Sequence, residues 1–194
     1  MGNSIITPEF RSTFVALMRP KAGKNDDGTA NDKMKYSVRA AFPPTADILD
    51  LKTEASAAAK AKWGANIPKS LKSPFRRNGD LDNPIEGIGD DWIIMTFSSN
   101  EEYFSPRFNL VDGRNNPIMD ETEVYSGAWF RAAVNAGAYE MAGNKGVAFY
   151  LQNIQKTRDD EAIGGGRVPA SKTFSPVGGA GKSAEPKSAG DVFM

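Results

Sequence analysis

The chain has 194 residues, of which 40% are hydrophobic and 25% charged, as expected for one domain with a core of its own. Its formal net charge is zero, and it contains neither cysteine nor histidine. These absences exclude disulfides and remove the usual zinc ligands and every Cys/His or Ser/His nucleophile pair. Because no apolar run could span a bilayer and the N-terminus lacks a signal-peptide pattern, the sequence predicts a cytoplasmic protein without membrane contact.

Two strands are expected in the N-terminal part of the chain. Residues 10–18 alternate in polarity, and residues 35–42 form a second alternating run. In this second run Tyr36, Val38 and Ala40 share one face, since successive strand residues point to opposite sides. Pro43 and the proline after it end the strand.

A helix is predicted from about residue 46 to residue 63. Thr45 or Asp47 can cap its N-terminus, and Gly64 ends it. Its apolar stripe is rich in alanine, which suits close packing against a sheet.

The segment from residue 55 to residue 79 carries no acidic residue and six basic ones, with two aromatic residues among them. Residues 80–123 instead contain eleven acids and two cations, so a neutral protein can present one basic groove. Basic side chains interleaved with aromatics favour nucleic-acid binding, although an ordinary solvated surface explains the run as well. The residues concerned are Lys60, Lys62, Trp63, Lys69, Lys72, Phe75, Arg76 and Arg77.

Residues 65–91 form a long irregular segment, and such loops in compact domains are usually functional or disordered. Residues 92–97 follow as the plainest buried strand, and residues 107–111 as a weaker one.

A long hairpin is predicted after residue 125, with its turn at residues 142–146. In its first strand Trp129, Arg131, Asn135 and Tyr139 share one face, while the other face is small and apolar. Aromatic rings with a guanidinium and an amide can stack bases and hold phosphates. An ordinary hairpin with one wetter face is the alternative.

Clustered acidic residues allow a second hypothesis, a magnesium-dependent carboxylate nuclease. Most clusters lie beside glycine, proline or asparagine, where acids usually solvate loops. The clusters are Asp90-Asp91, Glu101-Glu102, Asp120-Glu121-Glu123 and Asp159-Asp160-Glu161.

Residues 167–194 are rich in Gly, Ser, Ala, Pro and Lys and predict a flexible low-complexity tail after a domain of residues 1–166. Asp191 and Phe193 near its end could dock a partner. About six short strands and one inserted helix indicate an all-β fold, a five- to six-stranded antiparallel Greek-key barrel, with a β-sandwich as the alternative.

Several motifs, taken together, resemble one known family over residues 7 to 167. They are TPEFR at 7–11, KYSV at 35–38, KWG at 62–64, SPFR at 73–76, YSG at 125–127, GNKGVAF at 143–149 and QKTRDDEAIGGGR at 155–167. The chain is similar to single-stranded DNA-binding proteins of tailed bacteriophages with an OB fold. This resemblance implies a barrel that coats single-stranded DNA during phage replication and recombination in the infected bacterial host, without catalysis or cofactor.

The resemblance places DNA across the barrel face and its basic loops. We therefore predict a nucleic-acid site made of Tyr36, Arg39, Lys60, Trp63, Lys69, Lys72, Phe75, Arg76, Arg77, Trp129, Arg131, Tyr139 and Lys145. Single-stranded DNA is the expected partner, phage replication proteins are a further one through the tail, and a homodimer is left open. The alternatives are the nuclease and a phage structural or assembly protein that binds no DNA.

Overall fold

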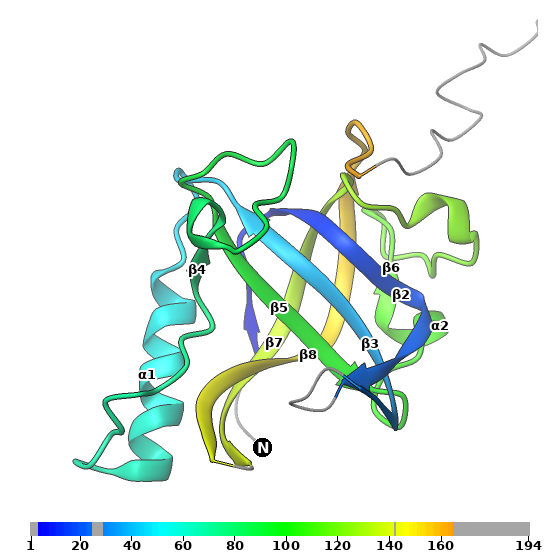
Figure 1. Cartoon of the computed structure of the whole chain (residues 1–194). Coiled ribbons are helices and arrows are strands. Elements are labelled where there is room, and N and C mark those ends of the chain that lie inside the picture. Colours follow the sequence, from blue (N-terminus) through cyan, green and yellow to red (C-terminus); the bar gives the residue numbers. More distant parts are fainter. Residues whose placement is uncertain (1–3, 25–28, 142, 165–194) are drawn as a thin grey trace, which may run out of the picture.

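The computed structural model describes residues 4–24, 29–141 and 143–164 (Figure 1). Its eight strands form one sheet in the order β1-β7-β2-β3-β5-β8-β6, with β4 beside β5. The strands are β1 (Ile5–Ile6), β2 (Phe10–Lys24), β3 (Ala30–Phe42), β4 (Arg76–Arg77), β5 (Ile93–Asn100), β6 (Leu110–Val111), β7 (Trp129–Met141) and β8 (Asn144–Arg158).

The sheet closes into a barrel because β8 also pairs with β7. The closed ring contains five strands, β7, β2, β3, β5 and β8, as the barrel prediction requires. One pair in this ring, β5 with β8, is parallel rather than antiparallel. A ring with an odd number of strands cannot alternate direction at every neighbour, so one parallel pair is unavoidable.

Phenylalanine side chains fill the barrel interior. The ring of Phe10 contacts those of Phe42 and Phe97 with centroids 5.5 and 5.6 Å apart, and Phe97 meets Phe149 at 6.1 Å. Edge-on contacts of this kind fit the charge distribution of aromatic rings. The expected alternation along β7 is confirmed, since Phe130 is completely buried on the core side.

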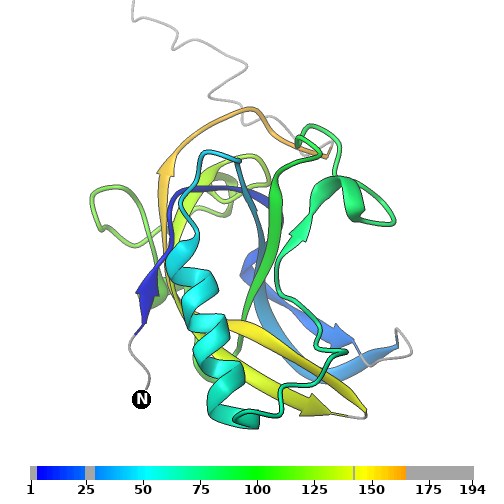
Figure 2. The ribbon, with the colours of Figure 1, turned by 90° about the vertical axis from the view of Figure 1, so that its left-hand side faces the viewer.

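The long helix α1 (Leu49–Trp63) packs against β7 and β8 (Figure 2). Leu51, and the small side chains of Ala55 and Ala59, are buried against the sheet, which confirms the expected packing role. The helix begins later than predicted. The Asp47 carboxylate accepts a hydrogen bond from Leu49 N at 3.0 Å, and Gly64 ends the helix with a φ of 58°.

The irregular segment before β5 is held by one buried amide. The Asn78 side chain donates to Ile85 O and Ile88 O at 3.2 and 2.9 Å and accepts from Ile85 N at 2.8 Å. The two isoleucines then pack on the outer side of β3 and β5 with Ile94 and Ile163. This loop is therefore an ordered segment that packs against the outer side of the sheet, and β4 attaches it to β5.

Several element boundaries differ from expectation. β2 and β3 extend well beyond the predicted residues 10–18 and 35–42, and residues 107–111 divide between the short helix α2 (Pro106–Asn109) and β6. Within the described residues, no helix has the length and apolar character needed to cross a membrane. The predicted tail, residues 167–194, lies outside the described residues.

Candidate nucleic-acid interface

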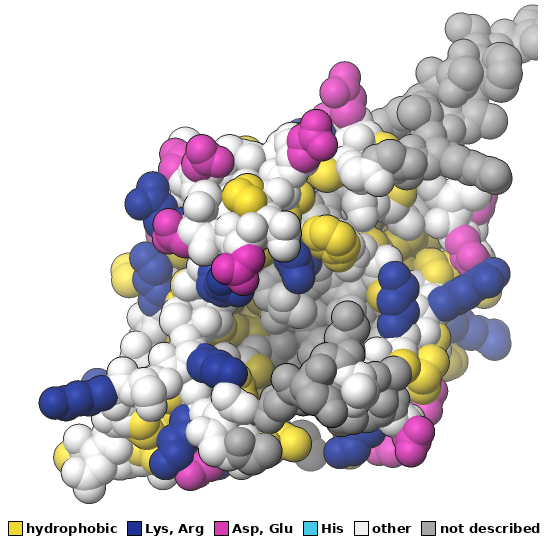
Figure 3. Space-filling view, in the orientation of Figure 1, with side chains coloured by type: hydrophobic (Ala, Val, Ile, Leu, Met, Phe, Trp, Pro, Cys, Tyr) yellow, Lys and Arg dark blue, Asp and Glu magenta, His cyan; other side chains and the backbone are white. Residues whose placement is uncertain are grey.

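A groove of about 830 Å³ lies on the outer surface of the barrel, over β3, β5 and β8. Arg39 and Thr96 form its floor, Arg76 on β4 and Lys72 form one wall, and Tyr139 of β7 borders it. Figure 3 shows a face hollowed near its middle, with Lys and Arg side chains around the hollow and several acidic side chains toward its upper edge. The cations therefore gather at a concave surface.

The charge in this groove is not neutralised from within the described chain. Partial burial lowers the pKa of Arg39, and the nearby Arg76 guanidinium lowers it further. Neither arginine forms an ion pair with a carboxylate of the described residues, and Asp82 lies at the groove's lining. Two arginines close together, neither of them in an ion pair, make a favourable place for a phosphate.

A second hollow, of about 340 Å³, continues the groove along the same strands. Ser98 follows Thr96 on the outer face of β5, and Tyr150 follows Ala148 on the outer face of β8, because residues two apart share a face. Lys35 and Tyr103 border this hollow. We call the two hollows together the outer groove.

Two tyrosine rings in the outer groove lie close to glycines. A Cβ at Gly146 would come within 2.5 Å of the Tyr139 hydroxyl, and one at Gly137 within 2.6 Å of Tyr150 Cε2. The missing side chains let each ring approach the sheet closely. Tyr150 is 43% exposed, so part of its ring is open to a flat ligand.

Phe14 also borders this surface, although no pattern in the sequence indicates it. Arg39 Cζ lies 4.6 Å from the centroid of its ring, which is 63% exposed. Strict alternation from Phe10 would have turned Phe14 into the core. For Tyr150 a signal did exist, since Phe149 and Leu151 on either side are apolar and face inward.

Of the predicted site residues, four lie together in the first hollow: Arg39, Lys72, Arg76 and Tyr139. Lys60 and Phe75 border a separate apolar hollow of about 490 Å³ between α1 and the following loop. The Phe75 ring packs edge-on against the core ring of Phe149 at 6.1 Å. Phe75 is therefore partly buried because its ring packs against the core.

Other predicted residues have partners within the fold. The Trp63 indole donates to Glu140 Oε2 at 3.4 Å, and Lys145 pairs with the same Glu140 at 2.9 Å. Tyr36 lies on the core-facing side of β3, opposite to Arg39, and its ring is 5.1 Å from that of Phe104. Lys69 and Arg77 are exposed and line neither hollow of the outer groove.

Trp129 and Arg131 share a strand face with Tyr139, as predicted, but lie at the other end of β7. Ten residues of strand separate Trp129 from Tyr139, or roughly 33 Å. Trp129 is 9% exposed, with Arg158 Cζ 3.9 Å from its centroid and the Trp92 ring 6.2 Å away. The expected open stacking face of Trp129 is therefore covered. Arg131 is exposed, and its Nε donates to Gln155 at 2.7 Å.

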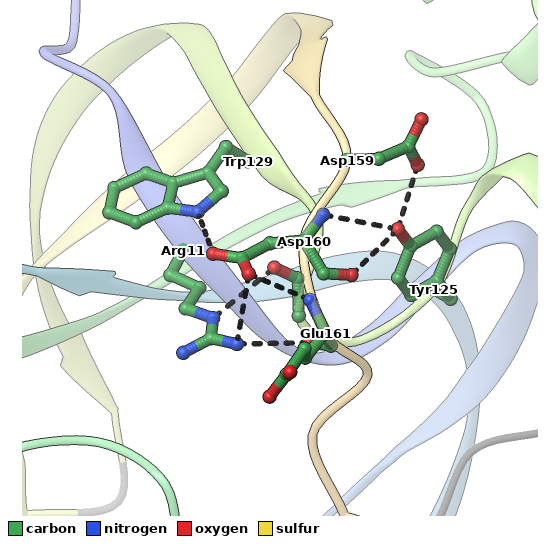
Figure 4. Close-up of polar contacts among 7 residues, drawn as sticks. Arg11, Tyr125, Trp129, Asp159, Asp160 and Glu161 are labelled. Atoms are coloured by element: carbon green, nitrogen blue, oxygen red, sulfur yellow. Dashed lines mark hydrogen bonds and ion pairs between the residues drawn. The ribbon is translucent and has the colours of Figure 1, made fainter. Parts of the chain in front are cut away.

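Trp129 belongs to a polar cluster around Asp160 (Figure 4). Its indole donates to Asp160 Oδ2 at 2.7 Å, and Arg11 lies 3.8 Å from Asp160 Oδ1 and donates to Glu161 O at 2.9 Å. The Trp129 hydrogen bond, and secondly that from the Glu161 backbone, lower the pKa of Asp160. Tyr125 donates to Asp160 O at 3.0 Å. The Asp160 cluster, made of Arg11, Tyr125, Trp129, Asp160 and Arg158, thus anchors the chain after β8.

The acidic clusters do not assemble a metal centre in the described part of the chain, where no three carboxylates come together to hold an ion. The Asp159-Asp160-Glu161 run is engaged in structural contacts instead, including Lys156 to Asp159 at 2.9 Å. Asp191 and Phe193, the predicted docking residues, lie outside the described residues.

A protein-family model described as "Enterobacter phage Enc34, ssDNA-binding protein" matches residues 3–185. A search of curated protein sequences finds no match.

Solved structures of bacteriophage proteins share the fold. A single-stranded DNA-binding protein from bacteriophage Enc34 superimposes with a TM-score of 0.60 at 22% identity, covering 89% of this chain and 90% of that one. The Enc34 protein in complex with ssDNA gives 0.61 at 22% identity, over 84% and 90%. The gp2.5 single-stranded DNA-binding protein of bacteriophage T7 gives 0.57 at 16% identity, over 82% and 94%.

Proposed function

The chain belongs to the Enc34 phage single-stranded DNA-binding family, and we propose that it binds single-stranded DNA along the outer groove during phage replication and recombination. The observation that carries this assignment is the pairing of two features in one concave surface. Arg39 and Arg76 form no ion pair with a carboxylate of the described residues, Tyr139 lies beside them in the first hollow, and the partly exposed Tyr150 lies in the second.

The groove suits the separate chemistries of a single strand. Phosphates bind the arginines by charge-assisted hydrogen bonds, while bases stack on the open tyrosine faces. Neither contact reads base edges, so affinity is nearly independent of sequence. Paired bases in a duplex keep their faces covered, which makes the unpaired strand the better ligand for the tyrosines.

The remaining predicted contacts extend this site. Lys60, Lys69 and Arg77 are exposed cations outside the outer groove that add attraction for the phosphate backbone. We assign Trp63, Phe75, Trp129 and Tyr36 to the fold, because each packs against other side chains. The infected bacterial cell is the proposed place of action. Two further predictions stay open: the docking of a replication partner through Asp191 and Phe193, and the formation of a homodimer.

The test is binding of a labelled oligonucleotide at several salt concentrations. Three basic side chains line the first hollow, Arg39, Lys72 and Arg76. If each neutralises one phosphate, the slope of log affinity against log salt is roughly −2, at about −0.7 per contact on single strands. A flat salt response, or tight binding to one sequence only, would contradict the proposal.

The nuclease and assembly-protein hypotheses are tested in the same experiment. We propose that the chain has no enzymatic activity, so the oligonucleotide stays intact when magnesium is added. Magnesium-dependent cleavage would favour a nuclease, and absence of binding at low salt would favour a structural or assembly protein.

A further inference from the structure

We infer that Phe14 stacks against a base of the bound strand, and that the protein keeps a strained backbone at this residue in order to present its ring. The inference rests on the proposed function and names one contact within it. Four observations carry it: the backbone angle of Phe14, a break in strand register, the exposure of the ring, and the position of Arg39.

The backbone at Phe14 has a φ of 50°. Bulky L-residues rarely adopt this region, because the side chain crowds the backbone. Among the described residues, the only other non-glycine with positive φ is Asn115, a residue type that tolerates it. A strained conformation on a surface strand persists only where the surroundings impose it, and such sites are often functional.

The strain arises at a bulge in β2. Thr13 pairs with Arg39, but the next pair toward the hairpin end is Ala16 with Ser37, so β2 has one extra residue here. In a regular strand Phe14 would lie opposite Val38 and point into the barrel with it. The bulge re-aims the ring to the outside, as bulges commonly do beside functional sites.

The outward ring lies beside the most basic part of the outer groove. Arg39 Cζ is 4.6 Å from the ring centroid, so the guanidinium covers one face by a cation–π contact. The ring remains 63% exposed, which leaves surface for a second flat group. A base stacked on Phe14 would bring its phosphate within reach of Arg39, and the groove would hold both parts of one nucleotide.

Three substitutions at this position in the full chain test the inference, with oligonucleotide affinity and melting temperature measured for each. Phe14→Leu keeps an apolar side chain and Phe14→Gly removes it, so both weaken binding by roughly 5- to 150-fold, the range for one lost stacked base. Phe14→Tyr keeps the ring and binds as the wild type does. Phe14→Gly also keeps or raises the melting temperature, because glycine adopts positive φ without strain.

A matched control is Phe108→Leu. Phe108 is 75% exposed and also has an arginine near its ring, with Arg107 Cζ at 5.6 Å. Arg107 lines neither hollow of the outer groove, whereas the arginine against Phe14, Arg39, lines the first. The substitution of Phe108 leaves affinity unchanged.

Wild-type affinity in Phe14→Leu and Phe14→Gly, or equal losses in Phe14→Leu and Phe14→Tyr, would overturn stacking at Phe14. A lower melting temperature in Phe14→Gly would contradict the inference that the backbone at Phe14 is strained. If the wild-type chain itself binds no single-stranded DNA, the proposed function fails, which is a distinct result.

Discussion

The outer groove and the Asp160 cluster are built from the same kinds of side chain, but only one of them has its charges neutralised. In each, an arginine lies against an aromatic ring, Arg39 on Phe14 and Arg158 on Trp129. In the Asp160 cluster, Arg11 and the Trp129 indole share the carboxylate of Asp160. In the outer groove Asp82 lines the same hollow as Arg39, but Arg39 forms no ion pair with a carboxylate of the described residues. Arginine and aromatic residues together therefore do not identify a binding site, and the position of the acids does.

The rings differ in the same way. Trp129 is enclosed between Arg158, Trp92 and the sheet, whereas Tyr150, which lies against Gly137, is 43% exposed. The comparison predicts that removing a side chain of the Asp160 cluster reduces stability, whereas removing a side chain of the outer groove reduces DNA affinity.

The largest expected effect on stability is that of Trp129→Ala. Removing a buried aromatic costs about 3–5 kcal/mol of unfolding free energy. A loss of roughly 1 kcal/mol lowers the melting temperature of a domain of this size by about 2–4 °C. Thermal unfolding of Trp129→Ala should therefore show a melting temperature lower by several times that amount. Oligonucleotide affinity, measured below the new melting temperature, should stay near that of the wild type. If Trp129→Ala melts as the wild type does but no longer binds the oligonucleotide, Trp129 contacts DNA and its assignment to the fold is wrong.

The second prediction concerns the two groove arginines. Charge-assisted hydrogen bonds are worth about 1.5–3 kcal/mol each, so Arg39→Ala with Arg76→Ala should weaken binding about 100-fold or more. The salt slope should become shallower by roughly 1.4, at about 0.7 for each lost phosphate contact. The matched control is Arg107→Ala with Arg114→Ala, two exposed cations that line neither hollow. Equal loss of affinity in both double variants would mean that only overall charge matters.

A third, smaller effect is expected at Tyr150. Tyr150→Ala should cost about 1–3 kcal/mol of binding, and Tyr150→Phe should keep most of it, since the ring does the stacking. Gly137→Ala sharpens this test, because the new Cβ would meet Tyr150 Cε2 at 2.6 Å and displace the ring. If Gly137→Ala binds normally in titrations, binding does not require the Tyr150 ring to lie against Gly137.

The smallest effect is the pH dependence that Asp160 confers. Its pKa in the folded state is lowered, chiefly by the Trp129 hydrogen bond. A lowered folded pKa favours the native state above the unfolded value of about 3.9, and this stabilisation is lost as pH falls through the folded pKa. Asp160→Asn should therefore reduce the melting temperature at neutral pH, with a difference from wild type that shrinks in acid. If the difference in melting temperature between Asp160→Asn and wild type does not change with pH, the charge of Asp160 is not the source of the stabilisation.

Much of the fold could be predicted from local patterns. Alternation along β7 correctly separated its inner and outer faces, and the Ala-rich stripe correctly predicted that α1 packs on a sheet. The missed features are those that interrupt a pattern. The bulge after Thr13 turned Phe14 outward, and the Asn78 amide ordered a loop that composition alone described as irregular.

The candidate site was predicted in part for the same reason. Arg39, Lys72, Arg76 and Tyr139 come from three separate segments and meet in one hollow. Trp129 was assigned with Tyr139 because they share a strand face, but a shared face says nothing of distance along a strand or of the segment that covers it. Asp160, 31 residues later, covers Trp129.

The all-β barrel with one helix and the likeness to phage single-stranded DNA-binding proteins follow from the amino-acid sequence, because periodicity and spaced motifs are local properties of a chain. Which arginines remain without an ion-pair partner and which rings remain exposed is set by the folded arrangement of the strands. Those outcomes depend on barrel closure, which brings β3, β5, β7 and β8 together at one surface while the segment after β8 returns to Arg11. Charge neutralisation and ring exposure are decided at contacts between distant segments, and no window of sequence contains both partners.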